Sequence, residues 1–233
     1  MTDNAARSAH EAAASMTPPQ PASSAYILDN ALEQARERLS AGAEWLDPWT
    51  IGQLEAIGVG QGWACLEAGA GGGSITKWLC KRVGEQGRVL ATDIDPRFLG
   101  VLSYLNLEVQ RHDITTDALP ENQFDLAHAR LLLCHLPSRD LALSRMIAAL
   151  KPGGWLVVED FDHITCGVVD PSEDPERASV YQAMWAADIK YMDAHGVSLD
   201  LGRRLYQMCR DQGLVHVEAE GHVLMSAGGS AFG

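Results

Sequence analysis

Basic side chains are scarce in this sequence. Among its 233 residues, 18 are Lys or Arg and 31 are Asp or Glu, so the formal net charge is −13 at pH 7. Nucleic-acid phosphates and anionic membrane surfaces attract clustered cations and repel carboxylates. We therefore expect neither nucleic acid nor a membrane among the partners of this protein.

Long apolar runs and paired cysteines are missing as well. No apolar stretch reaches the ~18 residues of a membrane span, and the N-terminus lacks the basic region and apolar core of a secretory signal. The five cysteines form no C-x-x-C pair and are odd in number, which excludes a zinc knuckle and disfavours a disulfide framework. We expect reduced, mostly buried thiols, no bound metal and a cytoplasmic protein. The cysteines are Cys65, Cys80, Cys134, Cys166 and Cys209.

The N-terminal part of the chain divides into two regions. Residues 1–24 are mainly Ala, Ser, Pro and Gln with few large apolar groups, which predicts a disordered leader. Residues 25–62 carry helical patterns. Apolar side chains recur at helical spacing over 26–39, and Asp47-Pro48 is typical of the start of a second helix, which would end at Gly58.

Residues 63–163 alternate between strand-like and helix-like apolar patterns. The patterns predict strands at 64–68, 88–92, 107–109, 124–129 and 155–158, helices at 75–83, 96–105 and 138–150, and a turn at 151–154. Strands that alternate with helices form a parallel sheet with helices on both faces. The expected fold class is therefore a doubly wound, mostly parallel, Rossmann-like α/β sheet.

Residues 164–200 interrupt this alternation with one long helix, predicted over 176–194. The helix carries an apolar stripe, and the favoured interpretation of such a stripe is packing against the core. The alternative is a helical lid over a substrate pocket, which would point to an apolar or aromatic acceptor. The stripe consists of Val180, Met184, Trp185, Ile189 and Met192.

The C-terminal region, 201–233, predicts one helix at 201–212 and one strand at 215–224. No pattern for a last strand follows, so either the chain is truncated or the sheet is completed in another way. Because an unpaired strand edge is destabilising, we expect a version extended at the C-terminus to be more stable.

A glycine-rich turn with the sequence EAGAGGGS follows the first expected strand, from Glu67 to Ser74. Glycines let the backbone turn sharply and let a ligand approach without a Cβ in the way. Asp93 ends the second strand, where its carboxylate can accept hydrogen bonds from two vicinal ribose hydroxyls. Together these features predict a cofactor that contains adenosine, bound at the carboxyl ends of the strands.

Three details separate the adenosine cofactors. A dinucleotide fingerprint has Gly or Ala where this chain has Ser74. Glu67 precedes the turn, where a carboxylate would attract an ammonium group but repel a pyrophosphate. Asp113 ends the third strand, where it can accept a hydrogen bond from an adenine amine. These details favour a nucleoside that carries an ammonium group.

Over residues 63–160, the motifs and their order resemble the class I S-adenosylmethionine-dependent methyltransferases, in particular the small-molecule type of quinone and secondary-metabolite biosynthesis. The motifs are Cys65–Gly73, Ala91–Pro96, His112–Ile114, Phe124–Leu136 and Leu150–Trp155. The resemblance implies S-adenosylmethionine as the cofactor, a small molecule as the methyl acceptor, and transfer by in-line displacement. It also implies an N-terminal helix that covers the cofactor.

The same resemblance implies cofactor contacts residue by residue. The methionine amine would face Glu67 and Gly69, the ribose would bind Asp93, and the adenine edge would bind Asp113. The full set is Glu67, Gly69, Ala70, Gly71, Gly73, Asp93, Ile94, Asp113, Ile114, Ala129, Arg130 and, from the N-terminal cap helix, Tyr26. For Tyr26, a place in the core is the alternative.

Two histidines are the candidate catalytic bases. His135 follows the fourth strand and His163 follows the fifth. A base adds a factor of about 10²–10⁴ for a hydroxyl acceptor and is not needed for a neutral amine or a stabilised carbanion. A structural contact is the alternative for His135, and His128, inside a strand, is interpreted as a satisfied core residue. The acidic residues within 159–162 are interpreted as a solvated strand end rather than a metal site.

Two other functions stay open at this point. A NAD(P)-dependent oxidoreductase uses the same combination of glycine turn and acid. A non-catalytic S-adenosylmethionine-binding module would bind the cofactor without turnover. The sequence does not determine the acceptor atom or the oligomeric state, including a homodimer.

Overall fold

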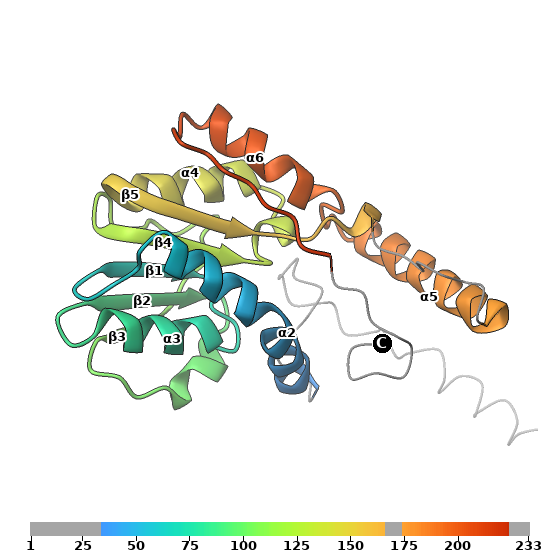
Figure 1. The fold of residues 1–233 in the computed structure, drawn as a ribbon, viewed down its shortest axis with the longest axis horizontal. Helices are drawn as coiled ribbons and strands as arrows, with labels where there is room; N and C mark the ends of the chain where they lie inside the picture. Colours follow the sequence, from blue (N-terminus) through green and yellow to red (C-terminus); the bar gives the residue numbers. More distant parts are fainter. Residues whose placement is uncertain (1–33, 166–173, 224–233) are drawn as a thin grey trace, which may run out of the picture.

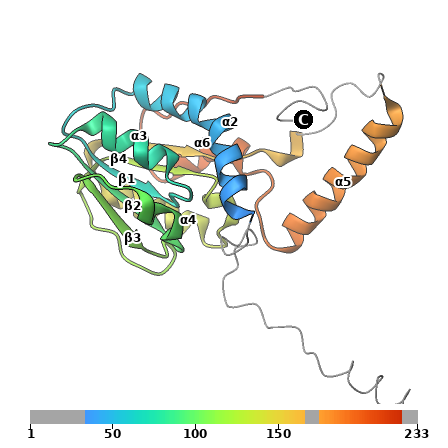
Figure 2. The ribbon, with the colours of Figure 1, turned by 90° about the horizontal axis from the view of Figure 1, so that it is seen from below.

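The computed structural model describes residues 34–165 and 174–223, which form a sheet between two layers of helices (Figures 1 and 2). The strands are β1 (Ala64–Ala68), β2 (Arg88–Asp93), β3 (Leu107–Arg111), β4 (Phe124–Arg130) and β5 (Leu150–Glu159). Their order is β3-β2-β1-β4-β5, and every neighbouring pair is parallel. The predicted doubly wound α/β fold is confirmed.

The chain reverses its direction of travel across the sheet between β1 and β4. From β1 it moves outward to β2 and β3, and from β4 it moves the opposite way to β5. Ligands of such folds bind outside the carboxyl ends of the strands at this switch point. The register brings these ends level, because Ala68 pairs with Thr92 on one side and with Ala129 on the other.

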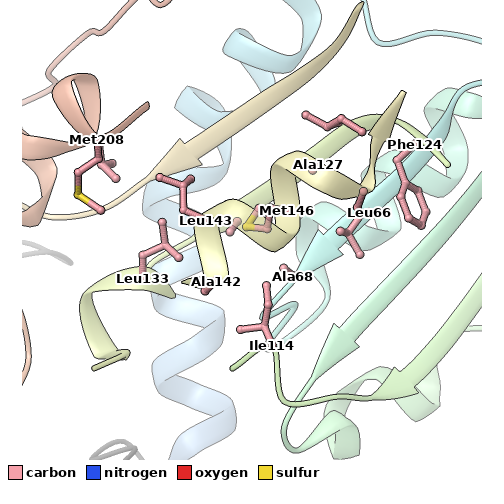
Figure 3. Close-up of a cluster of buried hydrophobic side chains, with 14 of the residues drawn as sticks. Leu66, Ala68, Ile114, Phe124, Ala127, Leu133, Ala142, Leu143, Met146 and Met208 are labelled. Atoms are coloured by element: carbon pink, nitrogen blue, oxygen red, sulfur yellow. The ribbon is translucent and has the colours of Figure 1, made fainter. Parts of the chain in front are cut away.

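Helices cover both faces of the sheet. They are α2 (Ala35–Ala56) and α3 (Ser74–Val83) on one face, and α4 (Arg139–Ala149) and α6 (Leu201–Asp211) on the other. Successive side chains of a strand point to opposite faces. Thus Cys65 of β1 packs in the cluster with α2 and α3, whereas Leu66 packs in the cluster with α4 and α6, which Figure 3 shows. A continuous apolar strand fits this arrangement because both of its faces are buried.

The break expected between two N-terminal helices at Asp47-Pro48 is not found in the described residues, where α2 runs through it, so this prediction was wrong; residues 26–33 of the first expected helix lie outside the described residues. Asp47 and Pro48 lie inside α2, and Asp47 accepts hydrogen bonds from Ser74 and Arg130 instead of capping a helix. The proline ring crowds the carbonyl one turn earlier and removes an N–H, which kinks a helix without ending it where both halves are packed. Figure 2 shows α2 changing direction along its length.

Two local boundaries also differ from expectation. The helix predicted over 96–105 is a shorter 3-10 helix, η1 (Pro96–Val101), which contains the poor helix former Gly100. The turn predicted at 151–154 belongs to β5 as an irregularity in the ladder. Here Leu150 pairs with Phe124 and Trp155 with Leu126, so the turn residues bulge from a strand that then resumes.

Helix α5 (Pro175–Ala194) begins within one residue of its predicted start, but its environment differs. None of its residues is buried, and Val180 and Met184 are 67% and 58% exposed. Figures 1 and 2 show the helix extending away from the sheet, and Met192 near its end packs against the core. Packing of the stripe on the core is therefore confirmed at Met192 and was wrong for Val180 and Met184, because helical spacing shows that residues share a face and not that a partner lies opposite.

Residues 214–223 follow an extended path without joining the sheet, so the strand predicted from residue 215 was wrong over the described residues. Side chains hold this segment to α2 instead. Gln53 Nε2 donates to Glu220 Oε2 at 2.7 Å, and His222 stacks on Trp49 with ring centroids 4.1 Å apart. Within the described part, β5 therefore forms one edge of the sheet.

The described cysteines are buried free thiols, as predicted. They are Cys65, Cys80, Cys134 and Cys209, and Cys166 lies outside the described residues. In the part of the chain that the structure describes, no helix has the length and apolar character needed to cross a bilayer.

Candidate functional site

A cavity of about 890 Å³ opens at the carboxyl ends of the central strands. The N-terminal half of α2 covers it through Leu39 and Trp45, and the ends of β1, β2 and β4 form its floor. Ligand pockets of proteins typically measure about 300–1,000 Å³. The cavity therefore has room for a nucleoside-sized ligand at the switch point where the fold class places one.

The glycine turn forms one wall of the cavity with a backbone that side chains would obstruct. Gly69 has φ +67°, and a Cβ there would lie 2.9 Å from a methyl group of Leu132. Gly73 has φ +77°, and a Cβ there would lie 2.8 Å from side-chain atoms of both Leu99 and Leu102. Glycine is required at both positions because other residues rarely adopt this conformation and the space is already filled.

Asp93 ends β2 beside this turn and shapes it. Its Oδ2 atom accepts from the Gly71 N–H at 2.8 Å, and its Oδ1 atom accepts from the Asp95 N–H at 2.9 Å. Burial raises the pKa of Asp93, while these backbone donors act to lower it. A carboxylate has about four acceptor positions, so Asp93 keeps acceptor capacity for a ligand hydroxyl beside its backbone donors. The residue lines the cavity.

The β3 end of the cavity combines a carboxylate with apolar side chains. Asp113 Oδ1 accepts from the N–H and the hydroxyl of Thr115, at 2.8 and 2.6 Å. Ile94 is 40% exposed although it is large and apolar, and it lines the cavity with Phe98, whose ring lies 5.0 Å from the Arg36 guanidinium carbon. This end suits a flat ring that carries an amine donor.

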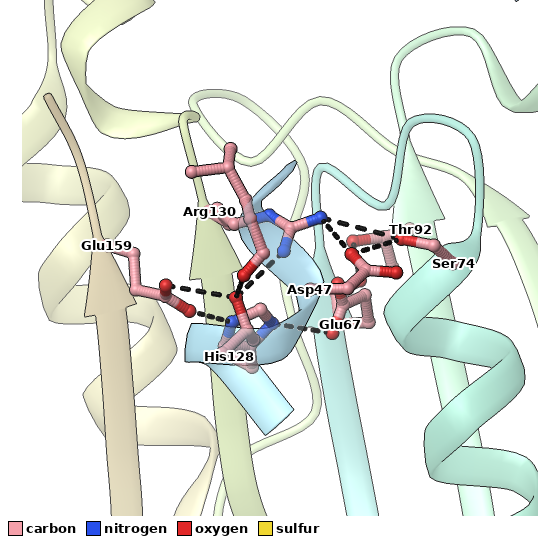
Figure 4. A network of polar contacts seen from close by, with 9 residues as sticks. Asp47, Glu67, Ser74, Thr92, His128, Arg130 and Glu159 are labelled. Atoms are coloured by element: carbon pink, nitrogen blue, oxygen red, sulfur yellow. Dashed lines mark hydrogen bonds and ion pairs between the residues drawn. The ribbon is translucent and has the colours of Figure 1, made fainter. Parts of the chain in front are cut away.

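A polar network joins the strand ends to α2 (Figure 4). The fully buried His128 of β4 places Nδ1 2.7 Å from Glu67 Oε2 and Nε2 3.0 Å from Glu159 Oε1. The Thr50 hydroxyl of α2 donates to Glu159 Oε2 at 3.0 Å and accepts from Arg130 Nη1 at 2.7 Å. The network thus crosses three strands and reaches the helix that covers the cavity.

The electrostatics of this network favour a charged imidazolium. Burial opposes the charged form of His128, but the carboxylates of Glu67 and Glu159 outweigh it and raise the pKa of His128 to about 9. In return, the hydrogen bond and charge of His128 lower the pKa of Glu159, although burial acts the other way. Two carboxylates and one imidazolium give these three side chains a formal net charge of −1.

The two candidate bases lie in different surroundings. His135, in the short 3-10 helix η2 (Leu133–His135), lines the cavity, and burial together with His163 and Arg38 lowers its pKa to about 4. His163 begins η3 (His163–Thr165) and lies between the rings of Phe161 and Trp185, at centroid distances of 5.2 and 6.0 Å. Burial lowers the pKa of His163 as well, so both imidazoles are neutral at pH 7.

The structure brings most of the predicted site residues to one cavity. Those that line it are Glu67, Gly69, Ala70, Gly71, Asp93, Ile94, Asp113, Ile114, Arg130 and His135. Gly73, Ala129 and His163 are not part of its lining, and Tyr26 lies outside the described residues. Gly73 sets the backbone of the turn, and Ala129 is 2% exposed within β4.

The expected N-terminal helix over the cavity is present as α2, but sequence reasoning missed its polar contacts with the site. Asp47 Oδ1 accepts from Ser74 Oγ and from Arg130 Nη2, both at 2.9 Å, which ties α2 to α3 and β4. The sequence signal for these contacts was Asp47 itself. Because Asp47-Pro48 was interpreted as the start of a helix, its hydrogen bonds to Ser74 and Arg130 were not predicted. The solvated strand end expected within 159–162 was also wrong, because burial is deep enough to raise the pKa of Asp160 to about 7. No group of acids suited to a metal occurs among the described residues.

Comparisons with known proteins agree with this geometry. Residues 66–158 match the family model described as a methyltransferase domain. Methyltransferase str3 of Strobilurus tenacellus is 29% identical over 170 residues, which cover 72% of this chain and 59% of that protein. A ubiquinone/menaquinone biosynthesis C-methyltransferase, UbiE, of Hydrogenovibrio crunogenus is 30% identical over 127 residues, which cover 50% of this chain and 49% of that protein.

The alignments thus span about half to three fifths of the length of these curated relatives. A solved structure of a SAM-dependent methyltransferase from Aquifex aeolicus superposes with a TM-score of 0.53 at 21% identity, covering 76% of this chain and 86% of that one. At this identity, the likeness shows a shared fold.

Proposed function

Residues 66–158 are a methyltransferase domain of the class I S-adenosylmethionine-dependent family, and from this premise we propose that the chain binds S-adenosylmethionine and methylates a small, apolar or aromatic acceptor. The single observation that carries the proposal is the placement of three carboxylates, Glu67, Asp93 and Asp113, on the walls of one cavity. Each lies at or just beyond the carboxyl end of a different strand, and each matches one polar part of this cofactor.

The donor and acceptor set fits S-adenosylmethionine better than a dinucleotide. Glu67 supplies a negative charge for the methionine ammonium group, Asp93 has acceptor positions left for the ribose hydroxyls, and Asp113 can accept from the adenine amine. A pyrophosphate would bring two negative charges toward these three carboxylates, which costs Coulomb energy in a partly buried cavity. This contrast favours the methyltransferase over the NAD(P)-dependent oxidoreductase.

When bound, S-adenosylmethionine supplies an electrophilic methyl group that an acceptor attacks in line with the carbon–sulfur bond. The protein contributes position and exclusion of water. The glycine turn and Asp93 orient the nucleoside, and α2 covers the cavity through Leu39 and Trp45. Alignment of two reactants of this kind lowers a barrier by roughly 7–11 kcal/mol, so no residue needs to form a bond with the substrate.

The cavity wall toward β5 indicates which kind of methyl acceptor could bind. Trp45 and Phe161 line the cavity with ring centroids 5.8 Å apart, and His135 lies on the same wall. With its pKa lowered to about 4, His135 is a weak base at neutral pH. These features support a planar apolar acceptor whose nucleophilic atom needs no strong base, such as an electron-rich ring carbon. The relative named a C-methyltransferase of ubiquinone and menaquinone biosynthesis supports the same acceptor class.

A ligand titration followed by a turnover assay tests the proposal. S-adenosylhomocysteine at 100 times its Kd should stabilise the protein by about 2.7 kcal/mol and raise its Tm, whereas NADH and NADPH should leave the Tm unchanged. Product detection by mass spectrometry with a panel of quinols, phenols and amines then identifies the acceptor. A Tm increase with NADH or NADPH but not with S-adenosylhomocysteine would overturn the proposal. Binding of S-adenosylmethionine without transfer to any acceptor would favour the non-catalytic binding module.

A further inference from the structure

His128, inside the sheet, forms a hydrogen bond with the Glu67 carboxylate from the side away from the cavity. Its imidazole is 0% exposed and does not line the cavity, whereas Glu67 lines the cavity and is 4% exposed. Among the described residues, the partner found for the Glu67 carboxylate is His128 Nδ1, at 2.7 Å. The opposite ring nitrogen is held by Glu159, so the imidazole cannot rotate without breaking a second bond.

We propose that His128 is a positioning residue that holds the Glu67 carboxylate in place, aimed at the ammonium group of the bound cofactor. The inference rests on the proposed function, because it concerns the amino-acid end of the same cofactor. It extends the site one layer below the cavity wall, to a residue that touches no ligand.

The need for such a residue follows from the burial of Glu67. An ionised carboxylate that is almost fully removed from water is unstable unless a charged or hydrogen-bonding partner compensates it. The His128 imidazolium supplies both compensations through one short contact. Without it, the Glu67 carboxylate would lose the contact that fixes its direction, and it would no longer face an ammonium group in the cavity.

Glu159 sets the formal net charge of the group around His128. An imidazolium paired with Glu67 alone would leave no net charge for the ligand. Glu159 adds a second carboxylate on the far side of the ring, 3.0 Å from Nε2, and Thr50 of α2 holds it through a 3.0 Å hydrogen bond. The Glu67–His128–Glu159 group therefore keeps one negative charge, matched to one ammonium group.

Two substitutions test the two hydrogen bonds of the His128 imidazole one at a time. In His128→Asn, the side-chain N–H group takes a position close to that of Nδ1 and can still donate to Glu67. In His128→Gln, the N–H group takes a position close to that of Nε2 and can donate to Glu159. Two ligands distinguish binding of the amino-acid part of the cofactor from binding of its nucleoside part. S-adenosylhomocysteine carries the ammonium group, whereas 5′-methylthioadenosine lacks the whole amino-acid part.

Calorimetric titration of the full chain with both ligands is the test. For His128→Gln we expect the Kd of S-adenosylhomocysteine to rise by about tenfold or more, the range of a lost bond to a charged group, with the Kd of 5′-methylthioadenosine within about twofold of wild type. For His128→Asn we expect a smaller rise for S-adenosylhomocysteine. Equal weakening of both ligands by His128→Gln would mean a merely structural role, and unchanged binding of S-adenosylhomocysteine would equally overturn the proposal.

Phe124→Leu provides the control for lost stability. Phe124 lies at the opposite end of β4, is 1% exposed and does not line the cavity. This variant should lower the Tm and leave both ligand affinities unchanged. The wild-type titration keeps the two proposals apart, because absence of S-adenosylhomocysteine binding by the wild type overturns the proposed function itself.

Discussion

Arg130 and Asp47 form an ion pair of 2.9 Å that joins the last residue of β4 to the middle of α2. Their side chains are 14% and 24% exposed, so the pair is largely shielded from water. Because the other half of α2 covers the cavity, this pair holds the cover in place at the kink beside Pro48.

Loss of this ion pair should loosen α2. We expect Asp47→Ala to lower the free energy of unfolding by roughly 1–3 kcal/mol, because it leaves the Arg130 charge and the Ser74 hydroxyl without their shared acceptor. Hydrogen exchange of the α2 amides should accelerate more than exchange in β1. Arg177→Ala is the control: it removes a pair whose members are 89% and 50% exposed, which should cost under about 1 kcal/mol.

Asp93→Ala should weaken binding of S-adenosylhomocysteine by at least about tenfold, since the hydrogen bonds of a charged carboxylate to the ribose are lost. The Gly71 and Asp95 N–H groups also lose their acceptor, so the turn itself should become less ordered. Calorimetric titration measures the effect. Asp125→Ala removes a comparable carboxylate at the other end of the sheet, bonded to Ala64 N–H and Lys151, and should lower stability without changing affinity.

Gly202→Ala should destabilise the junction between β5 and α6 by about 1–3 kcal/mol. A Cβ at Gly202 would lie 2.6 Å from the Asp160 carbonyl oxygen and 2.9 Å from the Asp162 backbone nitrogen, and a backbone cannot move aside as a side chain can. Urea denaturation gives the measurement. Gly52→Ala, inside α2 with nothing within 4 Å of a Cβ, should instead stabilise the protein by about 0.4–1 kcal/mol. Equal stability of the two variants would contradict this account.

Stability should fall at alkaline pH through His128. The Glu67 and Glu159 carboxylates raise its folded-state pKa to about 9 from the ordinary 6.5, so the charged form stabilises the fold fully below pH 6.5 and the contribution disappears as the pH rises through 9. Thermal unfolding measured from pH 6 to 9.5 should show the Tm of the wild type falling toward that of His128→Gln. A constant gap between the two proteins across this range would be evidence against the charged imidazolium.

Asp160 should also lower the stability as the pH rises, but in a lower pH range than His128. Burial raises its pKa from 3.8 to about 7, so its ionisation destabilises the fold as the pH rises between these values. Asp160→Asn removes this charge. We expect its Tm to exceed that of the wild type at pH 8 and the advantage to vanish near pH 4. A wild type that is more stable at pH 8 would show that the carboxylate is stabilised there by more than its contacts with Cys134.

Local sequence patterns predicted most of the fold. Short apolar runs predicted the strands, and β1, buried at every residue, shows why a strand covered on both faces is mainly apolar. The edge strand β3 is mostly exposed and has only two apolar residues, Leu107 and Val109. The glycine turn and the acids that follow β2 and β3 predicted where a ligand binds, because strand ends of a parallel sheet share one edge. These signals depend on neighbours a few residues apart, so they need no knowledge of packing.

Contacts between distant residues decided the rest. Pro48 follows a residue typical of a helix start, yet α2 continues through it, and Asp47 binds Arg130, 83 residues later in the chain, instead of capping a helix. His128 has the pattern of a core residue, and only its two carboxylate partners, 61 and 31 residues away, make it part of the site. The sequence by itself therefore determined the sheet and the ligand-binding edge, where the physics is local burial and backbone geometry. The tertiary structure decided the charge state and the cover of the cavity, because both depend on which side chains meet after folding.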